Sequence, residues 1–224
     1  MENDFIDHIN KNSLFSKDSK LLVAVSGGID SICLVSLLIE LKYNIEIAHC
    51  NFQLRSKESD EDLNFVRQFS ETNNISFHSR SFNTNEYAKN KKISIQMAAR
   101  ELRYDWLKKL RLDIKADHIV TGHNLDDKIE TFFLNIVRGT GLKGLISMKK
   151  NNDFIVRPLI FAKRKQIEDY VRIRKIHYRE DSSNISIKYK RNKVRHELIP
   201  LLKEFNPSVV DTIHNEIKIL ESTF

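Results

Sequence analysis

Short apolar runs alternate with longer stretches of mixed polarity over roughly the first two thirds of the chain. Five of these runs read as strands. Most of the segments between them have the apolar spacing of helices, and strands that alternate with helices are typical of a parallel sheet. We therefore predict an α/β fold, a Rossmann-like parallel five-stranded sheet flanked by helices. The predicted strands are Leu21–Val25, Ile45–His49, Ile75–His78, His118–Thr121 and Phe154–Val156.

The predicted helices differ in polarity. Residues 32–41 are apolar nearly all round, as expected of a helix packed deeply against the sheet. Residues 94–111 form a longer predicted helix, and apolar residues recur between 125 and 136 with the spacing of a helix that begins near Asn124. From about residue 163 the pattern is helical and basic, and it ends in an amphipathic stretch over residues 208–220. The sequence thus predicts a helical C-terminal extension.

Composition limits the class of protein. The 224 residues, 41% of them hydrophobic, suit one α/β domain or one domain with a small appendage. The chain shows no secretory signal pattern and no apolar stretch near 18 residues, so we expect a cytoplasmic protein with no membrane partner. Cys33 and Cys50 are the only cysteines, which indicates neither a disulfide framework nor a thiolate metal site.

Positive charge is concentrated in one part of the sequence. The chain carries a net charge of +7, yet residues 1–148 are balanced, with 20 basic and 20 acidic side chains. Residues 149–195 hold 15 basic against 5 acidic side chains. Such a segment attracts polyphosphate, most plausibly nucleic acid, although a lysine-rich solvated surface gives the same count.

A glycine-containing turn joins the first predicted strand to the first buried helix. Two glycines let the backbone approach a phosphate, serine hydroxyls donate to it, and the helix N-terminus offers free N–H groups. An ordinary strand-turn-helix corner is the alternative interpretation. The turn lacks the Walker pattern and its lysine, and it resembles the loop of ATP pyrophosphatases, which split ATP between its α- and β-phosphates. Its residues are Ser26, Gly27, Gly28, Ile29, Asp30 and Ser31.

A second polar cluster follows the fourth predicted strand. Asp126, Asp127 and Glu130 lie together at the start of one helix. They could simply complement the helix dipole, but they come at the carboxyl end of a strand, where open parallel sheets bind ligands. A carboxylate pair beside a triphosphate is a natural Mg²⁺ seat. His123 could bind phosphate or position a substrate, or be structural.

Several further segments match one family in order between residues 20 and 202. Together with the turn they resemble the tRNA(Ile)-lysidine synthetase family of the N-type ATP pyrophosphatase, or PP-loop, superfamily. Phe52 and Gln53 depart from it, because the family has histidine and glycine there. The matching segments are His49–Arg55, Gln96–Arg100 with Arg103 and Tyr104, Gly122–Thr131, Asn135–Gly139, Arg157–Leu159, Asp181–Asn184, and Arg191–Arg195 with Pro200.

The resemblance implies a fold of the adenine nucleotide alpha hydrolase type and a two-step reaction. The C2 oxygen of the wobble cytidine of tRNA(Ile) with a CAU anticodon attacks the α-phosphate of ATP, and pyrophosphate leaves. The ε-amine of free L-lysine then displaces AMP, and the modified tRNA reads AUA as isoleucine. Positioning and charge neutralisation dominate such transfers.

The resemblance also implies roles for particular residues. The six turn residues and Arg100 would bind ATP, with Asp30 and Asp127 as Mg²⁺ ligands and His123 and Arg195 as further catalytic residues. Asp126, Glu130, Arg138 and Arg191 are additional candidates for the site. The resemblance does not identify the residues of the lysine pocket. The oligomeric state is also undetermined, with a homodimer as one alternative. The basic residues expected to follow the tRNA backbone are Lys163, Arg164, Lys165, Arg172, Arg174 and Lys175.

Residues 1–202 are expected to form the catalytic domain, and residues 203–224 a helix that leads into a further helical domain. Two other PP-loop enzymes remain as alternatives, a tRNA thiolase and an amidotransferase-type synthetase. Thiolation usually needs well-placed cysteines, and a glutaminase partner needs its own domain. From another class, the chain could be a catalytically silent tRNA-binding module, which would not require the metal carboxylates.

Overall fold

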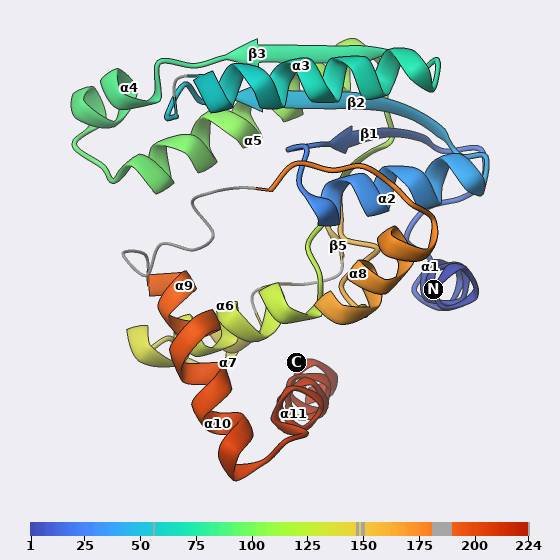
Figure 1. Ribbon diagram of the computed structural model, residues 1–224. Coiled ribbons are helices and arrows are strands. Elements are labelled where there is room, and N and C mark those ends of the chain that lie inside the picture. The colour runs from blue at the N-terminus through green and yellow to red at the C-terminus, as the bar shows by residue number, and fades with distance from the viewer. Residues whose placement is uncertain (56, 147, 149–150, 181–189, 224) are drawn as a thin grey trace.

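The computed structural model of the protein describes residues 1–55, 57–146, 148, 151–180 and 190–223. In this part of the chain six strands form one sheet in the order β3-β2-β1-β4-β6-β5 (Figure 1). Five strands pair in parallel, and the two-residue β5 pairs antiparallel with β6 at one edge. The predicted parallel five-stranded sheet is therefore confirmed, with one short strand added. The Asp181–Asn184 segment lies outside the described residues.

The six strands are short and most are buried in the middle of the molecule. Their bounds are β1 (Lys20–Ala24), β2 (Asn44–Asn51), β3 (Phe77–Ser81), β4 (His118–Thr121), β5 (Asn151–Asn152) and β6 (Ile155–Val156).

The third strand is displaced from its predicted position. The structure places it from Phe77 to Ser81 and not from Ile75. The backbone N–H of Ile75 donates to the carbonyl of Ser70 in the turn that precedes the strand. Pairing with β2 continues as far as Asn51, which carries β3 into polar, exposed residues. The prediction was wrong here because an apolar run marks where a strand is buried and not where its ladder ends.

Helices cover both faces of the sheet. Leu21 and Val23 of β1 pack on one face against helices α1, α2, α3 and α8, and Leu22 packs on the other face against α5. This alternation follows from the period of two in a strand. The helix bounds are α1 (Glu2–Lys11), α2 (Ile29–Glu40), α3 (Lys57–Thr72), α4 (Thr84–Lys91), α5 (Ile95–Asp113), α6 (Leu125–Arg138), α7 (Leu142–Leu145) and α8 (Arg164–Ile173).

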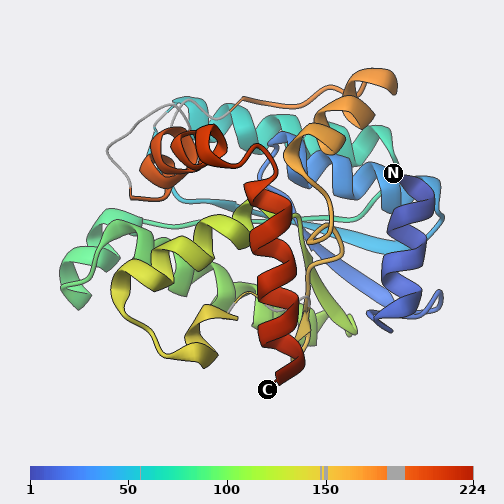
Figure 2. The ribbon, with the colours of Figure 1, turned by 90° about the horizontal axis from the view of Figure 1, so that it is seen from below.

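The C-terminal segment is helical, as predicted. It comprises α9 (Lys190–Lys193), a π-helical turn (Val194–Leu198), α10 (Ile199–Phe205) and α11 (Val209–Thr223). Its apolar side chains share a core with α6, and Lys128 of α6 forms a 2.7 Å ion pair with Glu221 of α11. In Figure 2, α11 runs across the side of the molecule next to α6. These contacts fix the helix that carries the second polar cluster. In the described part of the chain, no helix has the length and apolarity to span a membrane.

One glycine sets how closely the two predicted clusters approach each other. Gly122 follows β4, and a Cβ added there would lie 3.0 Å from the backbone carbon and oxygen of Asp30 and 3.1 Å from the Ser31 nitrogen. Real Cβ atoms rarely come this near to backbone, which cannot move out of the way as a side chain can. The absence of a side chain at Gly122 therefore allows the β4–α6 turn to pack against the start of α2.

We expect Gly122→Ala to lower the free energy of unfolding by about 1–3 kcal/mol, because the new methyl group must push the two turns apart. Gly141→Ala is the matched control, since a Cβ there meets nothing within 4 Å, and it should cost less than about 1 kcal/mol. Urea unfolding of both variants measures the difference. Equal stability of Gly122→Ala and wild type would contradict the close approach.

Candidate active site

The turn between β1 and α2 has the geometry of an anion cradle. Gly27 has a φ of +95°, a conformation that favours glycine. The Ser31 hydroxyl donates to the Gly28 carbonyl at 2.9 Å, while the Ser26 hydroxyl accepts from the Gly28 N–H at 3.3 Å. No side chain caps α2 at Gly28, so backbone N–H groups of its first turn face outward for a ligand. Ile29 is buried in the core, and only its backbone can contribute to binding.

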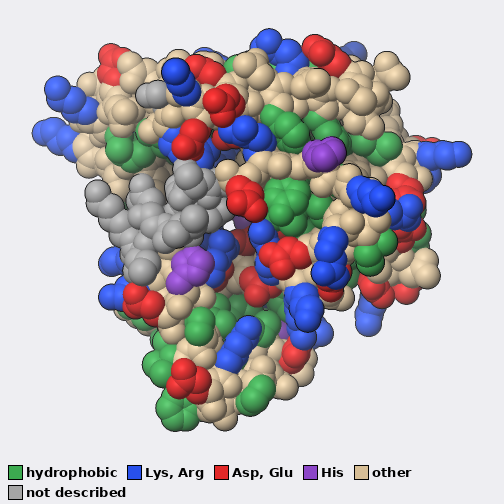
Figure 3. All heavy atoms as spheres, viewed as in Figure 1, with side chains coloured by type: hydrophobic (Ala, Val, Ile, Leu, Met, Phe, Trp, Pro, Cys, Tyr) green, Lys and Arg blue, Asp and Glu red, His purple; other side chains and the backbone are tan. Residues whose placement is uncertain are grey.

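The cradle lies where the strand order reverses. β1 has β2 on one side and β4 on the other, and ligands bind outside the carboxyl ends of strands at such a switch point. A cavity of about 200 Å³ opens there, lined by the turn residues Ser26, Asp30 and Ser31 and by His123. In the space-filling view, acidic and basic side chains gather around a hollow at the centre of the face (Figure 3).

Asp30 links three helix starts. One carboxylate oxygen accepts from the Asn124 amide at 3.1 Å, and the other accepts from the Arg164 guanidinium at 3.0 Å. Burial raises the pKa of Asp30, Arg164 opposes that shift, and the nearby charge of Asp127 adds to it. Asp30 and Asp127 are almost a hundred residues apart in the sequence, yet the fold brings them close enough for their charges to interact.

The start of α6 is a capping box. The Asn124 side chain accepts from the Asp127 N–H at 3.0 Å, and the Asp127 carboxylate accepts from the Asn124 N–H at 3.1 Å. The second Asp127 oxygen lies 3.5 Å from Arg195. Asp126 points elsewhere, because its carboxylate accepts from the backbone N–H of Arg164 at 2.7 Å. The two adjacent carboxylates therefore have different partners. Asp127 completes the capping box and lies beside Arg195, whereas Asp126 accepts from the backbone at the start of α8.

Glu130 is completely buried beneath this cluster. Its carboxylate accepts from Arg195 at 2.5 Å and lies 3.4 Å from the Arg191 guanidinium, which also donates to Thr131. Burial raises the pKa of Glu130 to about 7, with Arg195 working against the shift. The predicted Arg191 and Arg195 are therefore brought to the site by α9 and the π-helical turn, as partners of α6.

His123 lines the cavity as a neutral ring. Its Nδ1 is 2.8 Å from the Thr121 hydroxyl. Burial lowers the pKa of His123 to about 4. The charge of Asp127 opposes this shift, and nearby arginine charges add to it. A neutral histidine suits hydrogen bonding to a substrate better than it suits charge neutralisation.

Two predicted arginines lie away from the cavity. Arg100 is exposed on α5, with its guanidinium 5.0 Å from the Tyr104 ring, and Arg138 is exposed at the far end of α6. Arg103, one turn after Arg100, lines the cavity instead, and its guanidinium lies 5.2 Å over the Phe52 ring. Arg103 and Phe52 also line an adjoining cleft of about 560 Å³, and Arg191 lies on the wall of that cleft. The sequence matches the family at Arg103 but predicts no role for this residue.

The basic segment is partly neutralised within the chain. Four of the six residues expected to follow the tRNA backbone form ion pairs, two of them to the start and end of α2. These pairs join Lys163 to Asp211, Arg164 to Asp30 and Glu168, Arg172 to Asp169, and Arg174 to Glu2 and Glu40. Arg164 therefore belongs to the site, and the excess charge counted from the sequence overstates the free positive surface.

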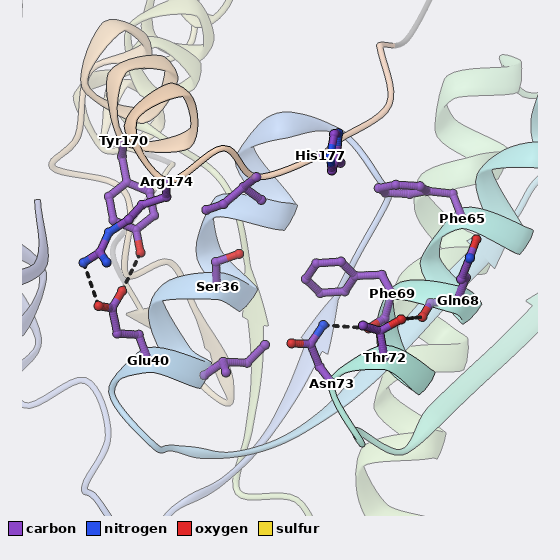
Figure 4. Close-up of a pocket in the computed structure, with 12 residues that line it drawn as sticks. Ser36, Glu40, Phe65, Gln68, Phe69, Thr72, Asn73, Tyr170, Arg174 and His177 are labelled. Carbon is purple, nitrogen blue, oxygen red and sulfur yellow. Dashed lines mark hydrogen bonds and ion pairs between the residues drawn. The ribbon is translucent and has the colours of Figure 1, made fainter.

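Another cleft, of about 530 Å³, lies between α2, α3 and α8 (Figure 4). It is lined by Phe65, Phe69 and the ion-paired Glu40 and Arg174, and it contains none of the predicted site residues. The motif residues converge instead on the strand-end cavity, which we take as the candidate active site.

Asp30 and Asp127 fit a Mg²⁺ seat with two protein ligands. Each carboxylate lies beside a cationic guanidinium, Arg164 for Asp30 and Arg195 for Asp127, and the two carboxylates are close enough for their charges to interact. Among the residues that the structure describes, no three histidine, cysteine or acidic side chains form a metal-binding group. Mg²⁺ usually takes one or two carboxylates and completes its shell with phosphate oxygens and water.

The PP-loop domain family matches residues 1–202, which include the turn between β1 and α2. The chain belongs to the PP-loop family. It is similar to curated proteins named tRNA(Ile)-lysidine synthase, which confirms the resemblance seen in the motifs. The identity is 47% to that of Porphyromonas gingivalis, covering 92% of this chain and 46% of the relative. It is 45% to that of Bacteroides thetaiotaomicron, covering 93% and 49%.

This PP-loop chain spans about half the length of the curated relatives it matches. Its fold is similar to that of the U34-tRNA thiolase NcsA from Methanococcus maripaludis, with a TM-score of 0.81 and 19% identity over 98% of this chain and 78% of that one. The NH3-dependent NAD synthetase from Campylobacter jejuni gives a TM-score of 0.58 and 16% identity, covering 97% and 91%. At these identities the likeness shows the fold alone.

The raised pKa of Glu130 predicts a pH dependence of stability. The fold favours the protonated carboxyl, so this contribution is full below a pH of about 4.5 and is lost as the pH rises through about 7. Relative to Glu130→Gln, wild type should lose up to about 3 kcal/mol of unfolding free energy across this window. Urea unfolding in EDTA at several pH values measures it. A wild-type to variant difference that does not change with pH would contradict the prediction.

Proposed function

We propose that this PP-loop chain carries the ATP-dependent catalytic site of a tRNA(Ile)-lysidine synthetase. The observation that carries the proposal is the convergence of Ser26, Asp30 and Ser31 of the turn with His123 on one cavity at the strand ends. Asp127 lies close enough for its charge to raise the pKa of Asp30. The similarity to named lysidine synthases over more than nine tenths of the chain supports the choice of substrate. The substrates are then ATP, free L-lysine and tRNA(Ile) with a CAU anticodon.

In the first step the turn holds the phosphates of ATP. N–H groups at the start of α2 and the hydroxyls of Ser26 and Ser31 would bind the departing pyrophosphate, whose negative charge grows as the bond breaks. Asp30 and Asp127 would hold Mg²⁺, which neutralises phosphate charge when bound. The C2 oxygen of cytidine attacks the α-phosphorus, the bond to the β-phosphate oxygen breaks, and an adenylated tRNA results.

In the second step the neutral ε-amine of lysine attacks C2 of the adenylated base. The carbon–oxygen bond to AMP breaks, AMP leaves, and the new amine loses a proton. Arg195 lies within 3.5 Å of Asp127 and would stabilise negative charge on the leaving phosphate. His123, anchored through Nδ1 by Thr121, has only Nε2 left for a ligand and would orient the base.

The cysteines argue against sulfur transfer by this chain. Cys33 is buried in the core of α2, and burial raises its pKa to about 12. Cys50 lines the cavity, and burial also raises its pKa to about 12. A reactive thiolate needs a lowered pKa, so neither side chain is prepared for thiolase chemistry.

Product analysis distinguishes this chemistry from ordinary ATP hydrolysis. With tRNA and ATP labelled at the α-phosphate, the products should be AMP and pyrophosphate when lysine is present. Without lysine, pyrophosphate release should stop at about one equivalent per tRNA, because the adenylated intermediate accumulates. ADP and orthophosphate as the primary products of the purified protein would overturn the proposal.

Asp127→Asn should reduce the rate of pyrophosphate release by about a hundredfold or more, because it removes a charge that holds the metal. Its melting temperature should change little, since asparagine can still accept from the Asn124 N–H. Asp126→Asn is the matched control: it removes the neighbouring charge, which contacts the α8 backbone, and should retain most activity. Near-normal release by Asp127→Asn, or equal defects in both variants, would refute the assignment.

A further inference from the structure

The first residue of α8 contacts the starts of two other helices. The Arg164 guanidinium donates to Asp30 of α2 at 3.0 Å through Nη1 and to Glu168 at 2.8 Å through Nε. The Arg164 backbone N–H is held by Asp126 of α6 at 2.7 Å. Arg164 is thus fixed from both its backbone and its side chain, and its charge lies against one of the two carboxylates proposed to hold Mg²⁺.

Other contacts, which do not involve Arg164, hold the C-terminal end of α8. Glu40, at the end of α2, accepts from the Tyr170 hydroxyl at 3.0 Å and from Arg174 at 2.6 Å (Figure 4). The buried faces of α2 and α8 also share the main core. The position of α8 therefore does not depend on the contact between Arg164 and Asp30. That contact can open by a side-chain movement while the helix stays in place.

A metal and a guanidinium cannot share the same face of one carboxylate oxygen. Oδ1 of Asp30 is taken by Asn124, and Oδ2 by Arg164. Without a nearby cation, Asp30 and Asp127 would repel each other in a partly buried place, which is costly. Arg164 supplies that cation in the ligand-free protein, and Mg²⁺ would supply it in the nucleotide complex.

We propose that Arg164 is the internal counter-ion of Asp30 and that Mg²⁺ displaces its guanidinium from Oδ2 when nucleotide binds. This inference rests on the proposed function, since it takes Asp30 as a metal ligand. It makes Arg164 a positioning residue that holds the Asp30 carboxylate at the cavity. After displacement, Arg164 retains its ion pair with Glu168 on the exposed side of α8.

The test measures binding and stability without turnover. The probe is α,β-methylene ATP, which cannot be split between its α- and β-phosphates, titrated with Mg²⁺ by calorimetry. Arg164→Gln should lower the Mg²⁺ concentration for half-maximal binding by about two- to fivefold. The variant removes a partly exposed guanidinium that competes with Mg²⁺ for the Asp30 carboxylate, and such exposed pairs are worth little. Its melting temperature without ligand should fall, and saturating Mg²⁺ and nucleotide should largely restore it. Arg172→Gln, which removes a charge paired with Asp169 on the same helix, should leave the Mg²⁺ midpoint unchanged.

Glu168→Gln provides an opposite change on an exposed side chain. It removes the second ion-pair partner of Arg164, so that Arg164 pairs more strongly with Asp30. The Mg²⁺ midpoint should therefore rise by about twofold. If Arg164→Gln does not fold, this variant decides alone. An unchanged or higher midpoint in Arg164→Gln, or an unchanged one in Glu168→Gln, would overturn the inference. Absence of Mg²⁺-dependent nucleotide binding in wild type would instead refute the proposed function.

Discussion

The candidate site depends on positive charges that neutralise several carboxylates in a partly buried part of the fold. The starts of α2 and α6 meet at the strand ends and bring together Asp30, Asp127 and Glu130. Such groups cannot all remain ionised without cations beside them. Guanidinium groups from α8, α9 and the following π-helical turn supply that charge. The C-terminal helices therefore contribute to the electrostatics of the candidate site, although the cavity itself is lined by the strand ends, the turn into α2 and one arginine of α5.

Close packing of backbone makes this balance specific. The β4–α6 turn can approach α2 only because residue 122 has no side chain. Asn124 then contacts Asp30 directly and fixes Asp127 through the capping box. The apolar contacts between α6 and α11 keep α6 in that position. The glycine-containing turn, the carboxylates and the arginines beside them are brought together by one arrangement of helix starts around the switch point of the sheet.

Local patterns were enough to predict the sheet, the turn and the α6 carboxylates, because strands, glycines and caps leave signals within a few residues. The helix α1 was not predicted, since only Phe5 and Ile9 are buried on it. The sequence predicts Arg164 as a tRNA contact, which stays a prediction, and it does not predict the ion pair with Asp30. Its partner Asp30 is more than a hundred residues away, and only tertiary packing pairs them. Arg103 and Arg100 look alike in sequence, and helical rotation alone decides which one lines the cavity.

A crystal structure with α,β-methylene ATP and Mg²⁺ tests the assignment of this cavity most directly. The β- and γ-phosphates should lie against the backbone of residues 26–31, and the metal should lie between the carboxylates of Asp30 and Asp127 and bridge to phosphate oxygens. Nucleotide bound elsewhere, for example in the cleft between α2, α3 and α8, or a metal that contacts neither carboxylate, would contradict the proposed catalytic site.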